Sequence, residues 1–184
     1  MKIEEKKVVK LWSEQEIKKM VDKIAEQIYE CYKENIKRGE ELVMVIVLHG
    51  GMFFGVDLYR KLEPLFLGNL YLDTLGISTY KNAIEPDQVR ILKDLSKSPR
   101  GKNILVVEDI VDTGETLHWI LQHLKAKKPK SIKVAVLIDK TPKRRKKVKI
   151  DFVGFNLEDP LWLVGYGLDY KGRGRGLEFI GYLV

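Results

Sequence analysis

The sequence predicts an α/β fold in which a central, mostly parallel sheet is flanked by helices and carries a small hood of short strands. Residues 42–48, 104–107 and 132–138 are almost unbroken runs of leucine, valine and isoleucine, a pattern typical of strands buried on both faces. Segments with helical spacing of apolar residues lie between these runs, and that alternation predicts a parallel sheet.

The length of the chain predicts a single domain. A chain of 184 residues is long enough to bury a sizeable core and short enough to form one unit. We expect one domain over residues 1–184, with its core over about 13–140 and the hood over about 141–184.

Composition favours a cytoplasmic protein. The single cysteine, Cys31, excludes an intramolecular disulfide and suits a reducing compartment. The first residues lack the apolar core of a signal peptide, and no apolar stretch approaches the ~20 residues that span a bilayer.

The net charge of +7 is compatible with anionic ligands. The basic run at residues 143–149 contains no aromatic residue, so we expect a solvated connection between strands and no nucleic-acid partner.

The first half of the chain reads as helix, strand, loop and helix. Ser13 and Glu16 form a capping box, and the helix that follows should run to about Ile36. Residues 42–48 should form the first strand of the sheet, and a His-Gly-Gly loop then leads into a second helix that Pro64 should stop. This order is the first half of a βαβ unit.

The second half continues the alternation and then changes character. We expect a strand within residues 70–78, a lid or small hairpin over 80–99, and a helix from Thr116 to about Lys125. The short strand candidates after residue 138 should form an appendage over the edge of the sheet; they are residues 151–155, 162–164 and 177–183.

The turn after residues 104–107 carries the strongest chemical signal. The apolar run ends at Glu108 and Asp109, a third acid follows at Asp112, and a small polar turn then leads into a helix. Open α/β sheets bind ligands at the carboxyl ends of their strands, and free N–H groups at a helix N-terminus suit a phosphate. Carboxylates beside a phosphate would repel it unless hydroxyls or Mg²⁺ intervene. These residues therefore indicate a ligand such as a phosphorylated ribose.

Residues 108–116, Glu-Asp-Ile-Val-Asp-Thr-Gly-Glu-Thr, resemble the phosphoribosyl-pyrophosphate motif of type I phosphoribosyltransferases. Further segments, in the family's chain order, resemble its hypoxanthine-guanine branch; they are Leu48-His49-Gly50-Gly51, Ser78-Thr79-Tyr80, Leu137-Ile138-Asp139-Lys140, residues 151–155 and residues 162–170. The resemblance implies the type I phosphoribosyltransferase fold and a homodimer or homotetramer. It also implies purine salvage, by Mg²⁺-dependent transfer of 5-phosphoribosyl from phosphoribosyl pyrophosphate to N9 of hypoxanthine or guanine.

The same resemblance assigns roles to the acidic turn. Glu108 and Asp109 would accept hydrogen bonds from the ribose hydroxyls, which Mg²⁺ also binds. Asp112 would act as acid and base at purine N7; without the surrounding motif it would be read as a helix cap. The 5-phosphate would be held by the turn as a whole, through Asp112, Thr113, Gly114, Glu115 and Thr116.

The purine would be held by two side chains and one backbone group, with Asp169 beside them. Lys140 would donate to the purine O6, which excludes adenine, although a solvated lysine is the default reading at a strand end. Trp162 would stack on the ring, with a core tryptophan as the competing interpretation. The Leu163 backbone would accept a hydrogen bond from the purine, and Asp169 would hold Mg²⁺ on the pyrophosphate side.

His49, Gly50 and Arg175 would bind pyrophosphate, and Ser78, Thr79 and Tyr80 would belong to the mobile lid. Two residues depart from the family pattern. His49 replaces a lysine, and Glu115 places a negative charge in the phosphate loop.

Two alternatives remain beside the salvage enzyme. One is a non-catalytic regulator on the same fold that senses phosphoribosyl pyrophosphate, and Asp112 argues against it. The other is a phosphoribosyltransferase that prefers xanthine.

Overall fold

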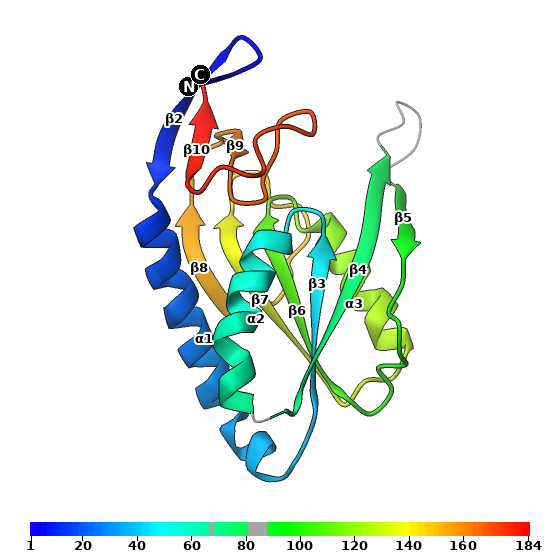
Figure 1. Cartoon of the computed structure of the whole chain (residues 1–184). Helices are drawn as coiled ribbons and strands as arrows, with labels where there is room; N and C mark the ends of the chain where they lie inside the picture. The colour runs from blue at the N-terminus through cyan, green and yellow to red at the C-terminus, as the bar shows by residue number, and fades with distance from the viewer. Residues whose placement is uncertain (67, 81–87) are drawn as a thin grey trace.

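The computed structural model describes residues 1–66, 68–80 and 88–184, except for the side chains of residues 79, 80 and 88. Its centre is a six-stranded sheet in the order β5-β4-β3-β6-β7-β8 (Figure 1). All neighbouring pairs are parallel except β4 and β5, which are antiparallel. The strands are β3 (Leu42–Leu48), β4 (Leu70–Tyr80), β5 (Gln88–Lys93), β6 (Asn103–Val111), β7 (Ser131–Lys140) and β8 (Phe152–Leu157). The predicted α/β class with a mostly parallel sheet is confirmed.

Helices cover both faces of this sheet and divide the core in two. The helices α1 (Glu14–Lys37) and α2 (Met52–Phe66) lie on the face turned toward the viewer in Figure 1, and α3 (Glu115–Ala126) lies behind. Met44 and Leu105 point toward α1 and α2, whereas Val45 and Val106 point toward α3. Alternate residues of each buried strand therefore enter opposite cores, which explains the unbroken apolar runs in the sequence.

The predicted capping box starts α1. The Glu16 N–H donates to Ser13 Oγ over 3.3 Å, and the Ser13 N–H donates to the Glu16 carboxylate over 2.9 Å. Both orphan donors are thereby satisfied, which fixes the first turn of the helix.

Two predicted ends are wrong. Helix α2 continues past Pro64 to Phe66, because a proline in the last turn removes only one backbone hydrogen bond and the fully buried Phe66 side chain holds that turn in place. Strand β6 continues past Val107 to Val111, because its backbone still pairs with β7 while the side chains turn acidic.

The hood is built from both ends of the chain, which corrects its predicted boundary at residue 141. It is a four-stranded sheet in the order β1-β2-β10-β9, from β1 (Lys2–Ile3), β2 (Lys6–Trp12), β9 (Leu163–Val164) and β10 (Ile180–Leu183) (Figure 1). Strand β8 is not part of it and extends the main sheet beside β7. The lysines within residues 6–12 interrupt the apolar pattern that is typical of a strand, so the sequence did not predict β2. Its partner β10 lies at the other end of the sequence.

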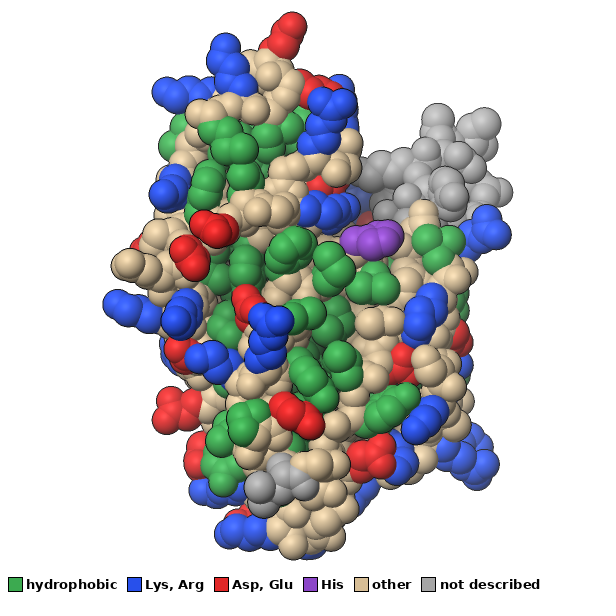
Figure 2. Space-filling view, viewed as in Figure 1, with side chains coloured by type: hydrophobic (Ala, Val, Ile, Leu, Met, Phe, Trp, Pro, Cys, Tyr) green, Lys and Arg blue, Asp and Glu red, His purple; other side chains and the backbone are tan. Residues whose placement is uncertain are grey.

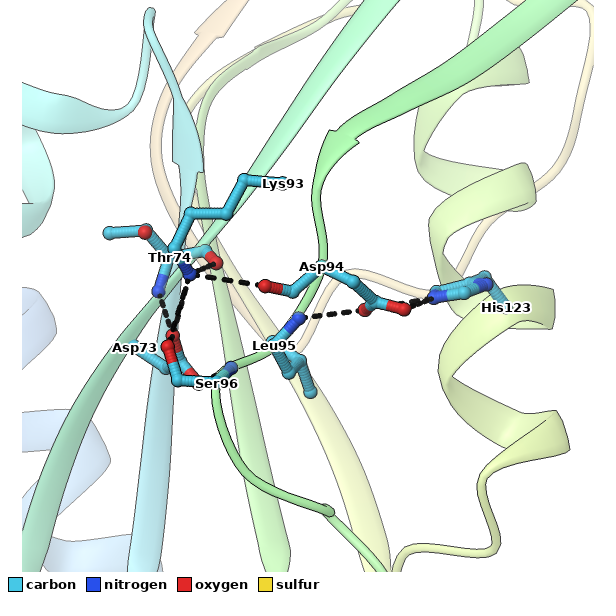
Figure 3. A network of polar contacts seen from close by, with 7 residues as sticks. All are labelled: Asp73, Thr74, Lys93, Asp94, Leu95, Ser96 and His123. Atoms are coloured by element: carbon cyan, nitrogen blue, oxygen red, sulfur yellow. Dashed lines mark hydrogen bonds and ion pairs between the residues drawn. The ribbon is translucent and has the colours of Figure 1, made fainter.

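The predicted hairpin over residues 80–99 is confirmed where the chain is described, because β5 returns antiparallel to β4. Figure 3 shows how its base is held. The buried Asp73 carboxylate accepts hydrogen bonds from Lys93 Nζ at 3.0 Å and from the Ser96 N–H at 2.7 Å. Asp94 contacts His123 of α3 at 3.1 Å. The hairpin is thus connected to α3, the helix that begins at the turn of residues 112–116, where the sequence predicts a phosphate site; this turn is called the phosphate-type turn below.

Lys and Arg side chains are interspersed with acids on the face drawn in Figure 2 and do not gather into one patch there. Among the described residues, no helix is long and apolar enough to cross a membrane.

Candidate active site

Two neighbouring cavities open where β3, β6 and β7 end, and they share Ile110 and Asp112. The first, of about 220 Å³, is lined by residues 108, 110–114, 116 and 117 at the strand end and turn and by parts of β3 and β4. The second, of about 250 Å³, contains Lys140 together with residues of the hood. The fold thereby brings the sequence motifs of residues 108–116, 137–140 and 162–169 to one place.

The turn of the first cavity has the geometry of an anion site. Gly114 lies at the N-cap of α3 with φ of 81° and no side-chain cap. A Cβ on Gly114 would lie 2.4 Å from the Lys146 carbonyl oxygen, so both the backbone angle and the packing require glycine. The Thr113 and Thr116 side chains line the same cavity. The α3 N-terminus and these hydroxyls can accept a phosphate.

The basic run connects β7 to β8 with most of its side chains exposed, as predicted, and its backbone also packs against this turn. The N–H groups of Arg145 and Lys146 both donate to the Thr113 carbonyl, at 2.9 and 3.0 Å. The Arg145 guanidinium also lies 3.8 Å from the Glu115 carboxylate. Arg145 is therefore an exposed and weak partner for the negative charge that Glu115 places in the loop.

Glu108 and Asp109 form a buried carboxyl pair, with exposed fractions of 8% and 7%. Burial raises the pKa of Glu108, and the neighbouring Asp109 charge raises it further. Burial also raises the pKa of Asp109, while hydrogen bonds and the Arg175 charge oppose this shift. Glu108 lines the first cavity and Asp109 the second. Such a pair gains stability from ligand hydroxyls or a cation.

These carboxylates suit Mg²⁺, which prefers oxygen ligands and usually keeps several waters while it bridges one or two carboxylates and substrate phosphates. Within the described ranges, no three His, Cys, Asp or Glu side chains gather as a metal cluster. Glu108 and Asp109 would then be two ligands beside substrate and water.

Asp112 and Lys140 face each other in the second cavity. Lys140 Nζ lies 3.4 Å from Asp112 Oδ2, and Lys140 is only 6% exposed. Asp112 Oδ1 is buried and has no hydrogen-bond partner among the described residues. The interpretation of Lys140 as a solvated lysine is wrong, and so is that of Asp112 as a helix cap, because the N-cap residue is Gly114.

Trp162 is 59% exposed at the rim of this cavity, so the competing interpretation as a core tryptophan is wrong. Its indole N–H donates to the Asp169 carbonyl over 3.2 Å, and the Tyr170 ring meets it edge-on at 5.9 Å. The ring is thus fixed by contacts with Asp169 and Tyr170 while much of its surface stays uncovered, which suits stacking against an aromatic ligand. Leu163 lies beside it and is buried in β9.

The loop at residues 49–51 meets the hood. The Leu48–His49 peptide is cis, and the His49 side chain is exposed. A Cβ on Gly50 would lie 2.0 Å from the Asp109 carboxylate, and a Cβ on Gly167 would lie 2.1 Å from the Gly50 carbonyl. The approach of these backbones depends on the glycines.

Arg175 and Asp169 stand on the hood side of the same loop. Their side chains pair at 2.6 Å, and Arg175 also donates to the Gly167 carbonyl at 2.6 Å. The Gly172 N–H donates to the second Asp169 oxygen at 2.6 Å. The three predicted pyrophosphate residues and Asp169 thus come from two loops that are in contact.

Of the three residues predicted to belong to the lid, the structure describes only the Ser78 side chain. Ser78 is half-buried near the end of β4. The side chains of Thr79 and Tyr80, and residues 81–87, lie outside the described part of the chain.

Sequence reasoning missed Arg144. Its guanidinium contacts the ends of both β6 and β7, at the carbonyls of Val111, Asp112 and Lys140 and at the Asp139 carboxylate. In the sequence, Arg144 does not stand out from the other basic residues of the run. The acidic residue Asp139, directly before Lys140, was the one sequence feature that could have indicated an ion-pair partner for it.

The chain is similar to known phosphoribosyltransferases over most of its length. The profile of the phosphoribosyl transferase domain family matches residues 13–171. Hypoxanthine phosphoribosyltransferase of Escherichia coli (strain K12) is 37% identical over 172 residues, which cover 93% of this chain and 92% of that protein. Hypoxanthine-guanine phosphoribosyltransferase of Bacillus subtilis (strain 168) is 37% identical over 174 residues, covering 94% and 91%.

Solved structures give the same result. A hypoxanthine phosphoribosyltransferase from Staphylococcus aureus matches with a TM-score of 0.85 at 32% identity, over 96% of this chain and 91% of that one. One from Trypanosoma cruzi matches with a TM-score of 0.87 at 34% identity, with the same coverage. The chain therefore belongs to the phosphoribosyltransferase family, within its group of hypoxanthine and hypoxanthine-guanine phosphoribosyltransferases.

Proposed function

We propose that this protein is a cytoplasmic, Mg²⁺-dependent purine salvage enzyme that transfers 5-phosphoribosyl from phosphoribosyl pyrophosphate to N9 of hypoxanthine or guanine. The observation that carries the proposal is the buried Lys140 ammonium opposite Asp112, in a cavity whose rim is Trp162. This arrangement offers a donor for a carbonyl oxygen, an acceptor for a ring proton and a surface for an aromatic base.

In the proposed reaction, a bond forms between purine N9 and the ribose anomeric carbon while the bond from that carbon to pyrophosphate breaks. The sugar passes through an oxocarbenium-like state. The purine becomes positively charged as it attacks, so a proton must leave its ring. Asp112 accepts that proton at N7.

The other residues orient the reactants. Lys140 donates a hydrogen bond to O6 and stabilises the negative charge that this oxygen gains as the ring proton leaves. Trp162 covers one face of the ring. The turn at residues 113–116 holds the 5-phosphate, and Arg175 attracts the departing pyrophosphate. Glu108 and Asp109 would hold Mg²⁺ beside the ribose hydroxyls and Asp169 would hold Mg²⁺ on the pyrophosphate side, where the ion would screen the charge of the pyrophosphate.

Steady-state kinetics with hypoxanthine, guanine, xanthine and adenine test the proposal. We expect turnover of the first two and none of adenine. A xanthine-preferring relative would show its highest kcat/KM with xanthine. Absence of product with any purine at saturating phosphoribosyl pyrophosphate and Mg²⁺ would favour the regulator and refute the enzyme.

Asp112→Asn tests the acid and base role. The change keeps the side-chain shape and removes the proton acceptor, so purine transfer should slow by about 10²–10⁴-fold. Asp159→Asn is the matched control, because it removes the same charge from an exposed position. Wild-type turnover in Asp112→Asn contradicts the assignment. We also expect a homodimer or homotetramer, which sedimentation velocity measures.

A further inference from the structure

The Arg144 side chain bridges the ends of the two strands that carry the proposed purine-side residues. On the β6 side, Nε donates to the Asp112 carbonyl at 2.9 Å and Nη2 donates to the Val111 carbonyl at 3.0 Å. On the β7 side, Nη2 contacts the Asp139 carboxylate and, more weakly at 3.3 Å, the Lys140 carbonyl. The side chain is 21% exposed, so these contacts are largely shielded from water.

The chemistry of strand ends explains why an arginine lies here. Where β6 and β7 stop pairing, their last carbonyl groups lose their ladder partners and need other donors. A guanidinium presents several N–H groups in a rigid plane, so one side chain can serve both strands. A lysine ammonium has the same charge on a flexible stem and cannot occupy these positions together.

Two of the carbonyl groups that Arg144 binds belong to the residues proposed to contact the purine. Arg144 binds the backbone of Asp112 and Lys140 themselves, whose side chains lie 3.4 Å apart across the cavity. These two residues are 28 positions apart in sequence, so their spacing depends on how the two strand ends are held together.

We propose that Arg144 is a positioning residue that sets the spacing between Asp112 and Lys140, and thereby aligns proton transfer at purine N7 with recognition of O6. The inference rests on the proposed function. It assigns Arg144 no contact with substrate. The phosphate turn has its own attachment, because the N–H groups of Arg145 and Lys146 hold the Thr113 carbonyl through the backbone.

Three variants test the proposal: Arg144→Ala, Arg144→Lys and the control Lys143→Ala. Lys143 is exposed and precedes Arg144 directly, so its removal changes the net charge equally. A displacement of about 1 Å in a catalytic constellation can cost ~10²-fold. We therefore expect kcat/KM for hypoxanthine to fall by about 10- to 100-fold in Arg144→Ala. Arg144→Lys should recover little of this loss, and Lys143→Ala should equal the wild type.

A second readout separates positioning from phosphate binding and from loss of fold. The dissociation constant for phosphoribosyl pyrophosphate with Mg²⁺, measured by calorimetry, should change by less than about threefold in Arg144→Lys, because the backbone attachment of the turn remains. Circular dichroism shows whether Arg144→Ala folds; if it does not, the folded Arg144→Lys variant carries the test.

Each contrary result has a distinct meaning. Full activity in Arg144→Lys shows that charge suffices and overturns the positioning role. A loss confined to phosphoribosyl pyrophosphate binding makes Arg144 a phosphate ligand and also overturns it. A wild-type protein that turns over no 6-oxopurine refutes the proposed function, and this inference with it, whereas an active wild type with an equally active Arg144→Ala refutes this inference alone.

Discussion

Replacing Gly50 with alanine tests whether the contact between the 49–51 loop and the buried carboxyl pair controls the site. The added Cβ would lie 2.0, 2.6 and 2.8 Å from the three carboxyl atoms of Asp109. A carbon and an oxygen atom do not normally approach within about 3 Å, so one group must move by about 1 Å.

The loop has little room to be the group that moves. Gly51 is packed against the Val47 and Val107 carbonyls, where a Cβ would lie at 2.8 and 3.1 Å, and the Gly50 carbonyl meets Gly167 on the hood side. The strain should therefore fall on Asp109. Overpacking of this kind lowers the free energy of unfolding by about 1–3 kcal/mol, and a displacement of about 1 Å at a reacting centre can reduce kcat/KM by ~10²-fold.

The measurements are thermal unfolding and steady-state kinetics with hypoxanthine and phosphoribosyl pyrophosphate. Gly176→Ala is the matched control, because a Cβ there meets nothing within 4 Å and the backbone angle is ordinary. The control should match the wild type in both. If Gly50→Ala keeps kcat/KM within about threefold of the wild type, the close packing of loop and carboxylate does not govern the reaction.

Three further changes give separate expectations. Lys140→Ala should lower kcat/KM for 6-oxopurines by about 10- to 100-fold through loss of a charged hydrogen bond, with binding of phosphoribosyl pyrophosphate nearly intact by calorimetry; unchanged purine kinetics would contradict its role. Trp162→Ala should raise KM for hypoxanthine by about 3- to 10-fold without changing the melting temperature, because the ring is 59% exposed; a large drop in melting temperature would return it to a structural role. Burial alone would raise the pKa of Asp94, but hydrogen bonds from Lys127 and His123 outweigh it and lower that pKa to about 2. Because this pKa is below that of the unfolded chain, the contribution of Asp94 to stability is present above about pH 4 and lost as pH falls toward 2, so denaturant titrations of Asp94→Asn should show a shallower decline over that interval than the wild type.

Local pattern accounts for the elements that the sequence predicted. The capping box at Ser13 and the apolar run at residues 42–48 depend only on neighbouring residues, so they can be predicted without knowledge of the fold. The acids and small residues of 108–116 gave the phosphate-type turn for the same reason. The ends of elements were less predictable, because continuation of α2 beyond Pro64 depends on burial of Phe66 by distant parts of the chain.

The candidate site divides in the same way. Pattern and resemblance named Asp112, Lys140 and Trp162 from short motifs, and their roles stay predictions for kinetics to test. Their proximity, and the exposure of the Trp162 ring, were not encoded in any one segment. Arg144 was invisible in a run of basic residues, because its partners are carbonyl groups that carry no sequence signal.

The sequence by itself determined the α/β class, the phosphate-type turn and the chemistry of the residues around it, because these follow from side-chain type and spacing over a few residues. Only the tertiary structure decided that the hood joins both ends of the chain, that β8 extends the main sheet, and that Asp112 and Lys140 meet at 3.4 Å. Such features arise from pairing between segments far apart in sequence, and that pairing depends on the packing of the whole chain.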